Sequence, residues 1–177
     1  MRGAASEAHR QGKLVLAHPS DITGLSAAVE GGVDILAHAI ERPLEVPPEL
    51  LVLMTRRGTA VIPTVALFGE KVLPQVKSYS RAGLDLLFGT DAGYRPEYET
   101  RPEFELLARA GLGFDAILAM LTTAPAARFR MAEQTGRVTP GLDADLVVLD
   151  GDPASDARAF AQVRYTLRAG KVIYRRQ

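Results

Sequence analysis

Three side chains that can bind a metal ion or move a proton each follow a short apolar segment of the chain. His18 follows the apolar residues 14–17, His38 follows residues 35–37, and Asp91 follows residues 86–88 after one Gly and one Thr. Short apolar segments of this kind are typical of buried strands, so each polar side chain falls at the carboxyl end of a strand. In a barrel of parallel strands these ends meet at one mouth, where active sites are built. The spacing therefore predicts that His18, His38 and Asp91 lie together.

The chemistry that these side chains would support is hydrolysis with a divalent metal ion. Two neutral imidazoles and a carboxylate suit Zn²⁺ or a similar ion and leave a position open for water. Such an ion lowers the pKa of water towards 7 and polarises a substrate carbonyl. A carboxylate beside the metal and the water can take the proton and pass it to a leaving nitrogen. We assign that role of general base to Asp91.

Two of the three residues, His18 and Asp91, also have a purely structural interpretation. His18 alone could be a histidine whose ring is satisfied by backbone groups at the end of a strand, and an aspartate after Gly-Thr is often a turn or cap residue. His38 repeats the placement of His18 one strand–helix unit later, which favours the ligand interpretation. The third histidine, His9, lies in a polar, helix-like stretch, and we expect it at the surface.

Composition limits the function classes that remain. The chain has 177 residues, 47% of them hydrophobic, which is enough for a sizeable buried core. Its 21 basic residues balance its 21 acidic residues, so we expect neither a nucleic-acid partner nor a membrane partner. The sequence has no cysteine, which excludes disulfides, thiolate metal sites and a cysteine nucleophile and agrees with a cytoplasmic location. It contains no glycine-rich phosphate loop and no G-x-S-x-G motif.

The order of the expected elements predicts an α/β fold. Strands are expected over residues 13–17, 33–37, 59–65 and 84–88, with helices after Ser20 or Asp21, from Pro47 and Pro48, and around 70–80. This alternation implies parallel strands with right-handed crossovers. Helices should follow, the first of them after Thr100 and Glu103, which have the spacing of a capping box.

The pattern of expected secondary structure changes near residue 135. A strand is expected over 146–149 and a hairpin over 163–174 with glycine in its turn. We therefore predict two units, an α/β unit over residues 1–134 and a small β unit over 135–177.

Several segments together resemble the amidohydrolase superfamily, and within it the imidazolonepropionase-like and prolidase-like branch. The segments GKLVLAH (12–18) and EGGVDILAH (30–38) resemble the fifth and sixth strands of its barrel, and FGTDAG (88–93) resembles the eighth. LTTAPA (121–126) is similar to a helix that follows. The tail, GRV (136–138) and PGLDADLVVLD (140–150), is similar to the returning segment of the family's β-sandwich.

The resemblance implies the C-terminal half of a (β/α)8 TIM-type barrel, strands five to eight, followed by part of a small β-sandwich. It implies that His18 is a metal ligand, that His38 binds a second metal or contacts the substrate, and that Asp91 is both metal ligand and general base. It also implies one or two divalent ions, with zinc as the main candidate. These ions would take part in hydrolysing an amide C–N bond in a small-molecule substrate, either a cyclic amide or a dipeptide-like compound.

The sequence also departs from the family's pattern. The His-x-His pair of the first strand is absent, as are the fourth-strand segment and the first half of the β-sandwich. A full barrel takes about 250 residues. The alternative is therefore a truncated, catalytically inactive half-barrel that needs self-association or a partner chain carrying the missing N-terminal half. A non-enzymatic binding module on an α/β scaffold is a third reading, which leaves the placement of the three residues unexplained.

Overall fold

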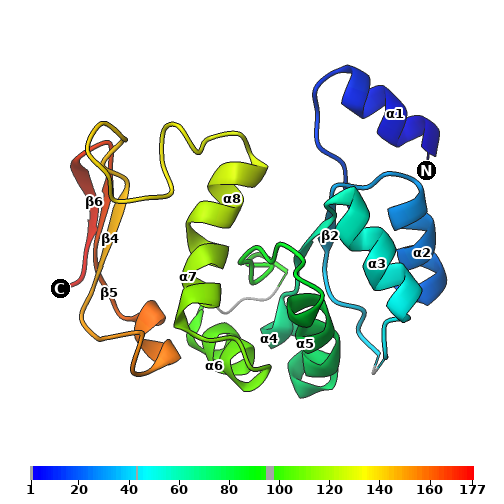
Figure 1. Ribbon diagram of the computed structural model, residues 1–177. Coiled ribbons are helices and arrows are strands. Elements are labelled where there is room, and N and C mark those ends of the chain that lie inside the picture. Colours follow the sequence, from blue (N-terminus) through cyan, green and yellow to red (C-terminus); the bar gives the residue numbers. More distant parts are fainter. Residues whose placement is uncertain (1, 43, 95–97) are drawn as a thin grey trace.

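The computed structural model describes residues 2–42, 44–94 and 98–177, and its first part is an α/β arrangement (Figure 1). Three short parallel strands form one sheet in the order β1-β2-β3, namely β1 (Leu16–Ala17), β2 (Ile35–Ala37) and β3 (Ala60–Ile62). Helices α2 (Ile22–Glu30) and α3 (Pro48–Arg57) connect them, and α1 (Arg2–Arg10) precedes them. The predicted α/β class with parallel strands is confirmed.

Further helices follow the third strand. They are α4 (Val65–Phe68), the 3₁₀ helix η1 (Gly69–Val72), α5 (Leu73–Arg81), α6 (Arg101–Arg109), α7 (Phe114–Leu121) and α8 (Thr123–Arg128). Local signals set the ends of the earlier ones. The Asp21 side chain accepts a hydrogen bond from the Gly24 amide at 2.7 Å and caps α2. Gly58, at φ 63°, ends α3 in the left-handed conformation that favours glycine.

The parallel strands are shorter than the sequence predicts, and the first is less buried. Residues 13–15 do not join β1, because the Lys13 amide bonds Ala8 at the end of α1 and the Val15 amide bonds the Asp34 carboxylate. Leu16 is 52% exposed, so β1 is not covered on both faces as expected. The prediction of a continuous strand over 13–17 was therefore wrong.

The fourth expected strand is present only as an extended segment beside β3. Val61 and Leu86 form an isolated parallel bridge, with Val61 N bonded to Asp85 O and Leu87 N bonded to Val61 O, both at 2.9 Å. The ladder stops there, since the Phe88 amide donates to Met120 O in α7 instead. The direction of this segment was predicted correctly, but its length as a strand was not.

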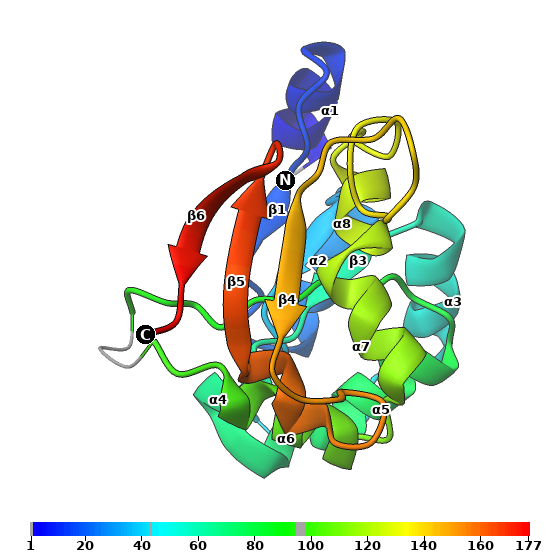
Figure 2. The ribbon, with the colours of Figure 1, turned by 90° about the vertical axis from the view of Figure 1, so that its left-hand side faces the viewer.

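The C-terminal residues form an antiparallel sheet of β4 (Leu146–Leu149), β5 (Val163–Arg168) and β6 (Lys171–Arg175), which lies nearest the viewer in Figure 2. The predicted hairpin joins β5 to β6 through Ala169 and Gly170, whose φ angles of 48° and 76° suit the twist of a tight hairpin. A 3₁₀ helix, η2 (Ala157–Ala161), lies between β4 and β5.

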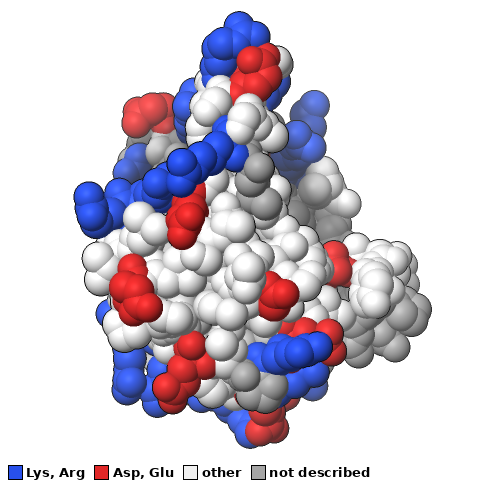
Figure 3. Space-filling model, turned by 90° about the vertical axis from the view of Figure 1, so that its right-hand side faces the viewer, with Lys and Arg blue, Asp and Glu red and all other residues white. Residues whose placement is uncertain are grey.

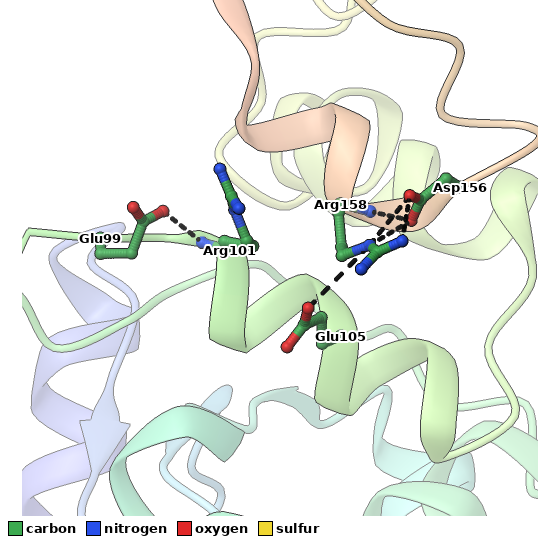
Figure 4. A network of polar contacts seen from close by, with 5 residues as sticks. All are labelled: Glu99, Arg101, Glu105, Asp156 and Arg158. Carbon is green, nitrogen blue, oxygen red and sulfur yellow. Dashed lines mark hydrogen bonds and ion pairs between the residues drawn. The ribbon is translucent and has the colours of Figure 1, made fainter.

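The antiparallel sheet is attached to the helices through η2 and α6. Phe160 of η2 stacks on Phe104 of α6 and on Phe114 of α7, with ring centroids 5.3 and 5.9 Å apart. At the surface of the same contact, Arg158 pairs with Asp156 at 2.8 Å and lies 4.0 Å from Glu105 of α6 (Figure 4). The exposed ion pairs add little to stability, so the buried phenyl rings dominate this contact.

The core extends from the helices around the parallel sheet to Phe160. Its fully buried members come from α2, β2, α3, β3, α5, α6 and α7 and include Leu25, Leu36, Met54, Val61, Val76, Leu107 and Ile117. Among the described residues, no helix has the length and apolar character needed to cross a membrane.

Candidate active site

The structure brings together His18 and His38, at the carboxyl ends of their strands, and Asp91, after the extended segment beside β3. His18 follows the last residue of β1 and His38 the last residue of β2, and because these strands are neighbours in the sheet their rings lie 5.0 Å apart, edge to face. The Asp91 Oδ2 atom lies 3.9 Å from His38 Nε2. The predicted convergence of the three side chains is therefore observed. Their chemical roles remain a prediction.

His38 is the central and most enclosed residue of the group. Its side chain is 13% exposed, whereas that of Asp91 is 36% exposed and His18 is exposed. The Nδ1 atom of His38 is hydrogen bonded to Thr64 Oγ1 at 2.7 Å, which leaves Nε2 on the side of Asp91. Burial, and to a lesser degree His18, lowers the pKa of His38, although the Asp91 carboxylate acts in the opposite direction. The lowered pKa favours the neutral ring, which is the form that binds a metal ion.

Two residues of the site are in the left-handed backbone region, Thr64 at φ 46° and ψ 54° and Asp91 at φ 57°. Aspartate tolerates that region, because its short polar side chain can form local hydrogen bonds. The conformation is strained for a β-branched residue such as Thr64. Strained residues persist where the surrounding structure holds them, and they concentrate at functional sites.

A buried glutamate is hydrogen bonded to the backbone next to Thr64, and the sequence analysis did not predict it. Glu103 of α6 is fully buried and accepts hydrogen bonds from the Val65 and Ala66 amides at 2.9 and 2.7 Å. It does not form the predicted capping box, and Thr100 makes no side-chain cap, because Glu103 points into the core. Its spacing to the buried Leu107 and Ala110 on one face of α6 was the available signal.

The same carboxyl group is only weakly acidic. Burial raises the pKa of Glu103 to about 7, and the two backbone hydrogen bonds only partly oppose that shift.

A glycine sets how closely the Asp91 segment approaches β3. A Cβ atom on Gly89 would lie 2.6 Å from Cγ2 of Ile62, far inside van der Waals contact. Gly89 therefore lets the segment that leads to Asp91 pack directly on β3. This close approach helps to bring Asp91 near His38, which follows β2, the neighbour of β3 in the sheet.

The donor set fits a divalent metal ion in its chemistry. Two imidazoles and one carboxylate are ligands of zinc, and the 3.9 Å between His38 Nε2 and Asp91 Oδ2 is close to the roughly 3.4 Å expected between two ligand atoms of a tetrahedral zinc ion. Within residues 2–42, 44–94 and 98–177, no three His, Asp or Glu side chains are grouped tightly enough to hold an ion. The three residues are thus neighbours without forming a complete cage.

Known proteins similar to this chain are hydrolases. It is 26% identical to ochratoxinase from Aspergillus niger over 94% of the chain and 39% of the relative. It superimposes on a Xaa-Pro dipeptidase with bound methionine (TM-score 0.86, 22% identity) and on a prolidase complexed with N-methylphosphonate-L-proline (TM-score 0.84, 28% identity). Both superpositions cover 99% of this chain and 48% of the other. The chain thus spans about half the length of these relatives, or less.

The chain also matches the model of a whole protein family over nearly its full length. The model of the amidohydrolase family matches residues 1–173, nearly the whole chain. The predicted resemblance is confirmed: this chain belongs to the amidohydrolase family.

Proposed function

We propose that this chain carries part of the active site of a metal-dependent hydrolase that cleaves an amide C–N bond. The observation that carries the proposal is the convergence of His18, His38 and Asp91, with 3.9 Å between His38 Nε2 and Asp91 Oδ2. In this proposal β1, β2, β3 and the extended segment over residues 84–88 are strands five to eight of a (β/α)8 barrel, and residues 135–177 are a separate unit, part of a β-sandwich. Relatives named as a prolidase and a Xaa-Pro dipeptidase favour a dipeptide-like substrate.

The roles of the residues follow from their positions. His18, His38 and Asp91 would hold one or two divalent ions, zinc first, and such an ion supplies a water of lowered pKa and polarises the substrate carbonyl. The half-exposed Asp91 carboxylate can take a proton on one oxygen and deliver it to the leaving nitrogen. The hydrogen bond from Thr64 to Nδ1 of His38 would hold the ring with its Nε2 atom facing that carboxylate.

A second candidate is a catalytically inactive half-barrel that depends on self-association or on a partner chain. The specific observation in its favour is that, among the described residues, β1 pairs with no strand other than β2, while Leu16 on it is 52% exposed. An edge strand with an exposed apolar side chain is a site for pairing with another strand. The two candidates differ in activity, not in ancestry.

Replacement of Asp91 tests the first candidate. In a full-length protein that includes the other half of the barrel, we expect Asp91→Asn to abolish hydrolysis of Xaa-Pro dipeptides and cyclic amides, with the far-ultraviolet circular dichroism unchanged, because an amide cannot accept the proton. The matched control is Asp85→Asn, an exposed aspartate on the same segment whose pairing with Arg128 is peripheral to the site. Retained turnover in Asp91→Asn would contradict the role given to this residue.

Metal content and molecular mass, measured on the same sample, separate the two candidates. About one zinc ion per chain, lost in His18→Ala and kept in His9→Ala, supports a metal site. A chain that binds no zinc, or that is active only with a second polypeptide, supports the second candidate.

A further inference from the structure

We propose that Glu103 is a positioning residue for His38: through the amides of Val65 and Ala66 it fixes Thr64, which sets the orientation and tautomer of the His38 ring. This inference rests on the proposed function in one respect, since it gives His38 a role at the reacting centre. The contacts that carry it cross three elements, α6, α4 and the end of β2.

The first link is the contact between Glu103 and the start of α4. The first amides of a helix have no partner within the helix, and here two of them donate to the two oxygens of one carboxylate. Glu103 and Val65 are both fully buried, so water cannot replace these hydrogen bonds. The carboxyl group of Glu103 therefore holds the first residues of α4 in place.

The second link is Thr64, the residue directly before those amides. Its left-handed conformation is unfavourable for a β-branched residue, and it is 1% exposed. Such a conformation lasts only where both sides of the residue are held. Glu103 holds the following residues, while the preceding Pro63 accepts a hydrogen bond from the Ala39 amide at 3.1 Å. The segment over residues 63–66 is therefore tied to Glu103 on one side and to the end of β2 on the other.

The third link is the hydrogen bond from Thr64 to the ring. Thr64 Oγ1 lies 2.7 Å from His38 Nδ1, and Nε2 lies on the Asp91 side. For Nε2 to offer its lone pair, a neutral ring must carry its proton on Nδ1, and Thr64 Oγ1 then accepts it. Partners of this kind orient metal-binding histidines and raise their affinity for the ion. A shift of Thr64 would release both the ring angle and the tautomer.

The test compares Glu103→Gln with a control on the same helix, Glu105→Gln, whose carboxylate is exposed and lies 4.0 Å from Arg158. The first readout is the ¹⁵N–¹H spectrum of the His38 ring in the metal-free chain, which reports the tautomer. The second is the zinc affinity measured by competition with a chelator. We expect Glu103→Gln to convert a ring protonated on Nδ1 into a mixture of tautomers and to weaken zinc binding by about 10- to 100-fold. Glu105→Gln should change neither.

A pair of Thr64 variants tests the last link. Thr64→Val removes the hydroxyl group and should shift the tautomer as Glu103→Gln does, while Thr64→Ser, which keeps the hydroxyl group, should restore it. If Glu103→Gln does not fold, Glu103→Asp, which withdraws the carboxylate by one methylene, is measured in its place.

The outcomes distinguish this inference from the proposed function. A folded Glu103 variant whose His38 signals and zinc affinity match the wild type overturns the positioning role. A wild-type chain that binds no zinc, but whose His38 tautomer responds to Glu103→Gln, overturns the metal role and leaves the positioning role in place.

Discussion

At the scale of single residues, the sequence predicted the three side chains that meet but not the two that hold them. His18, His38 and Asp91 could be predicted because each follows an apolar segment, and the ends of parallel strands converge by topology alone. Thr64 and Glu103 could not, because their contacts join side chains and amides 26 to 38 positions apart in the sequence. Local propensity favours glutamate near the start of a helix, and the capping-box prediction failed for that reason.

Gly89 offers a residue-scale prediction. We expect Gly89→Ala to destabilise the chain by about 1–3 kcal/mol, because the new methyl group must displace Cγ2 of Ile62, which is fixed close to the backbone of β3. Urea unfolding followed by circular dichroism measures the effect. The control is Gly3→Ala in α1, where a Cβ atom meets nothing within 4 Å and the helix should gain up to about 1 kcal/mol. Equal midpoints for the two variants would contradict the close approach described above.

At the scale of elements, capping signals predicted helix ends better than apolar runs predicted strand ends. Asp21 and Gly58 act through their own backbone and side-chain chemistry, which the local sequence determines. The length of β1 depends instead on Asp34, whose carboxylate takes the Val15 amide away from the sheet. Similarly, the segment at 84–88 leaves β3 because Met120 of α7 accepts the Phe88 amide. Both effects come from tertiary contacts that periodicity does not reveal.

The contact between η2 and α6 leads to a prediction at this scale. Phe160→Ala should lower the free energy of unfolding by about 3–5 kcal/mol, because a ring that is only 7% exposed leaves a cavity between Phe104 and Phe114. The control, Phe129→Ala, removes a ring that is 48% exposed and should cost much less. The two urea midpoints provide the comparison. Similar losses in both variants would show that the ring stack is not what attaches the antiparallel sheet.

At the scale of the whole molecule, the main features are the balance of acidic and basic residues and the share of each relative's length that this chain spans. The 21 basic and 21 acidic residues cancel, and on the face drawn in Figure 3 both signs are interspersed with uncharged surface. The superimposed relatives are about twice as long, and the described part of the parallel sheet has three strands. The sequence predicted the family from short segments, because those segments contain the strand ends and turns that the family's chemistry needs. It could not fix the packing of residues 135–177, since Phe160 gives no local sign of its partner.

The pH dependence of stability is a whole-molecule property to which Glu103 should contribute visibly. Its pKa is raised to about 7 from an ordinary 4.5, so the folded chain binds this proton more tightly than the unfolded chain does. The contribution of this group to the free energy of unfolding is at its full value below pH 4.5. It decreases as the pH rises towards 7 and is lost above pH 7, a change of at most about 3 kcal/mol. Because the lowered pKa of His38 acts with the opposite sign, the wild type must be compared with Glu103→Gln.

We expect the urea concentration at the unfolding midpoint to decrease as the pH is raised from 5 to 8, and to decrease more in the wild type than in Glu103→Gln. Parallel curves for the two proteins across this range would show that the buried carboxyl group titrates normally.

The aromatic stack has a consequence for how damage spreads through the molecule. Phe88, three residues before Asp91, stacks on Phe104 at 4.7 Å, and Phe104 in turn stacks on Phe160. The segment after residue 135 is therefore packed, through these rings, against the segment that leads to Asp91, although it contributes none of the three residues that meet there. Inherited or engineered changes that loosen this aromatic stack should therefore displace Asp91 as well, and a screen confined to the strand ends would overlook them.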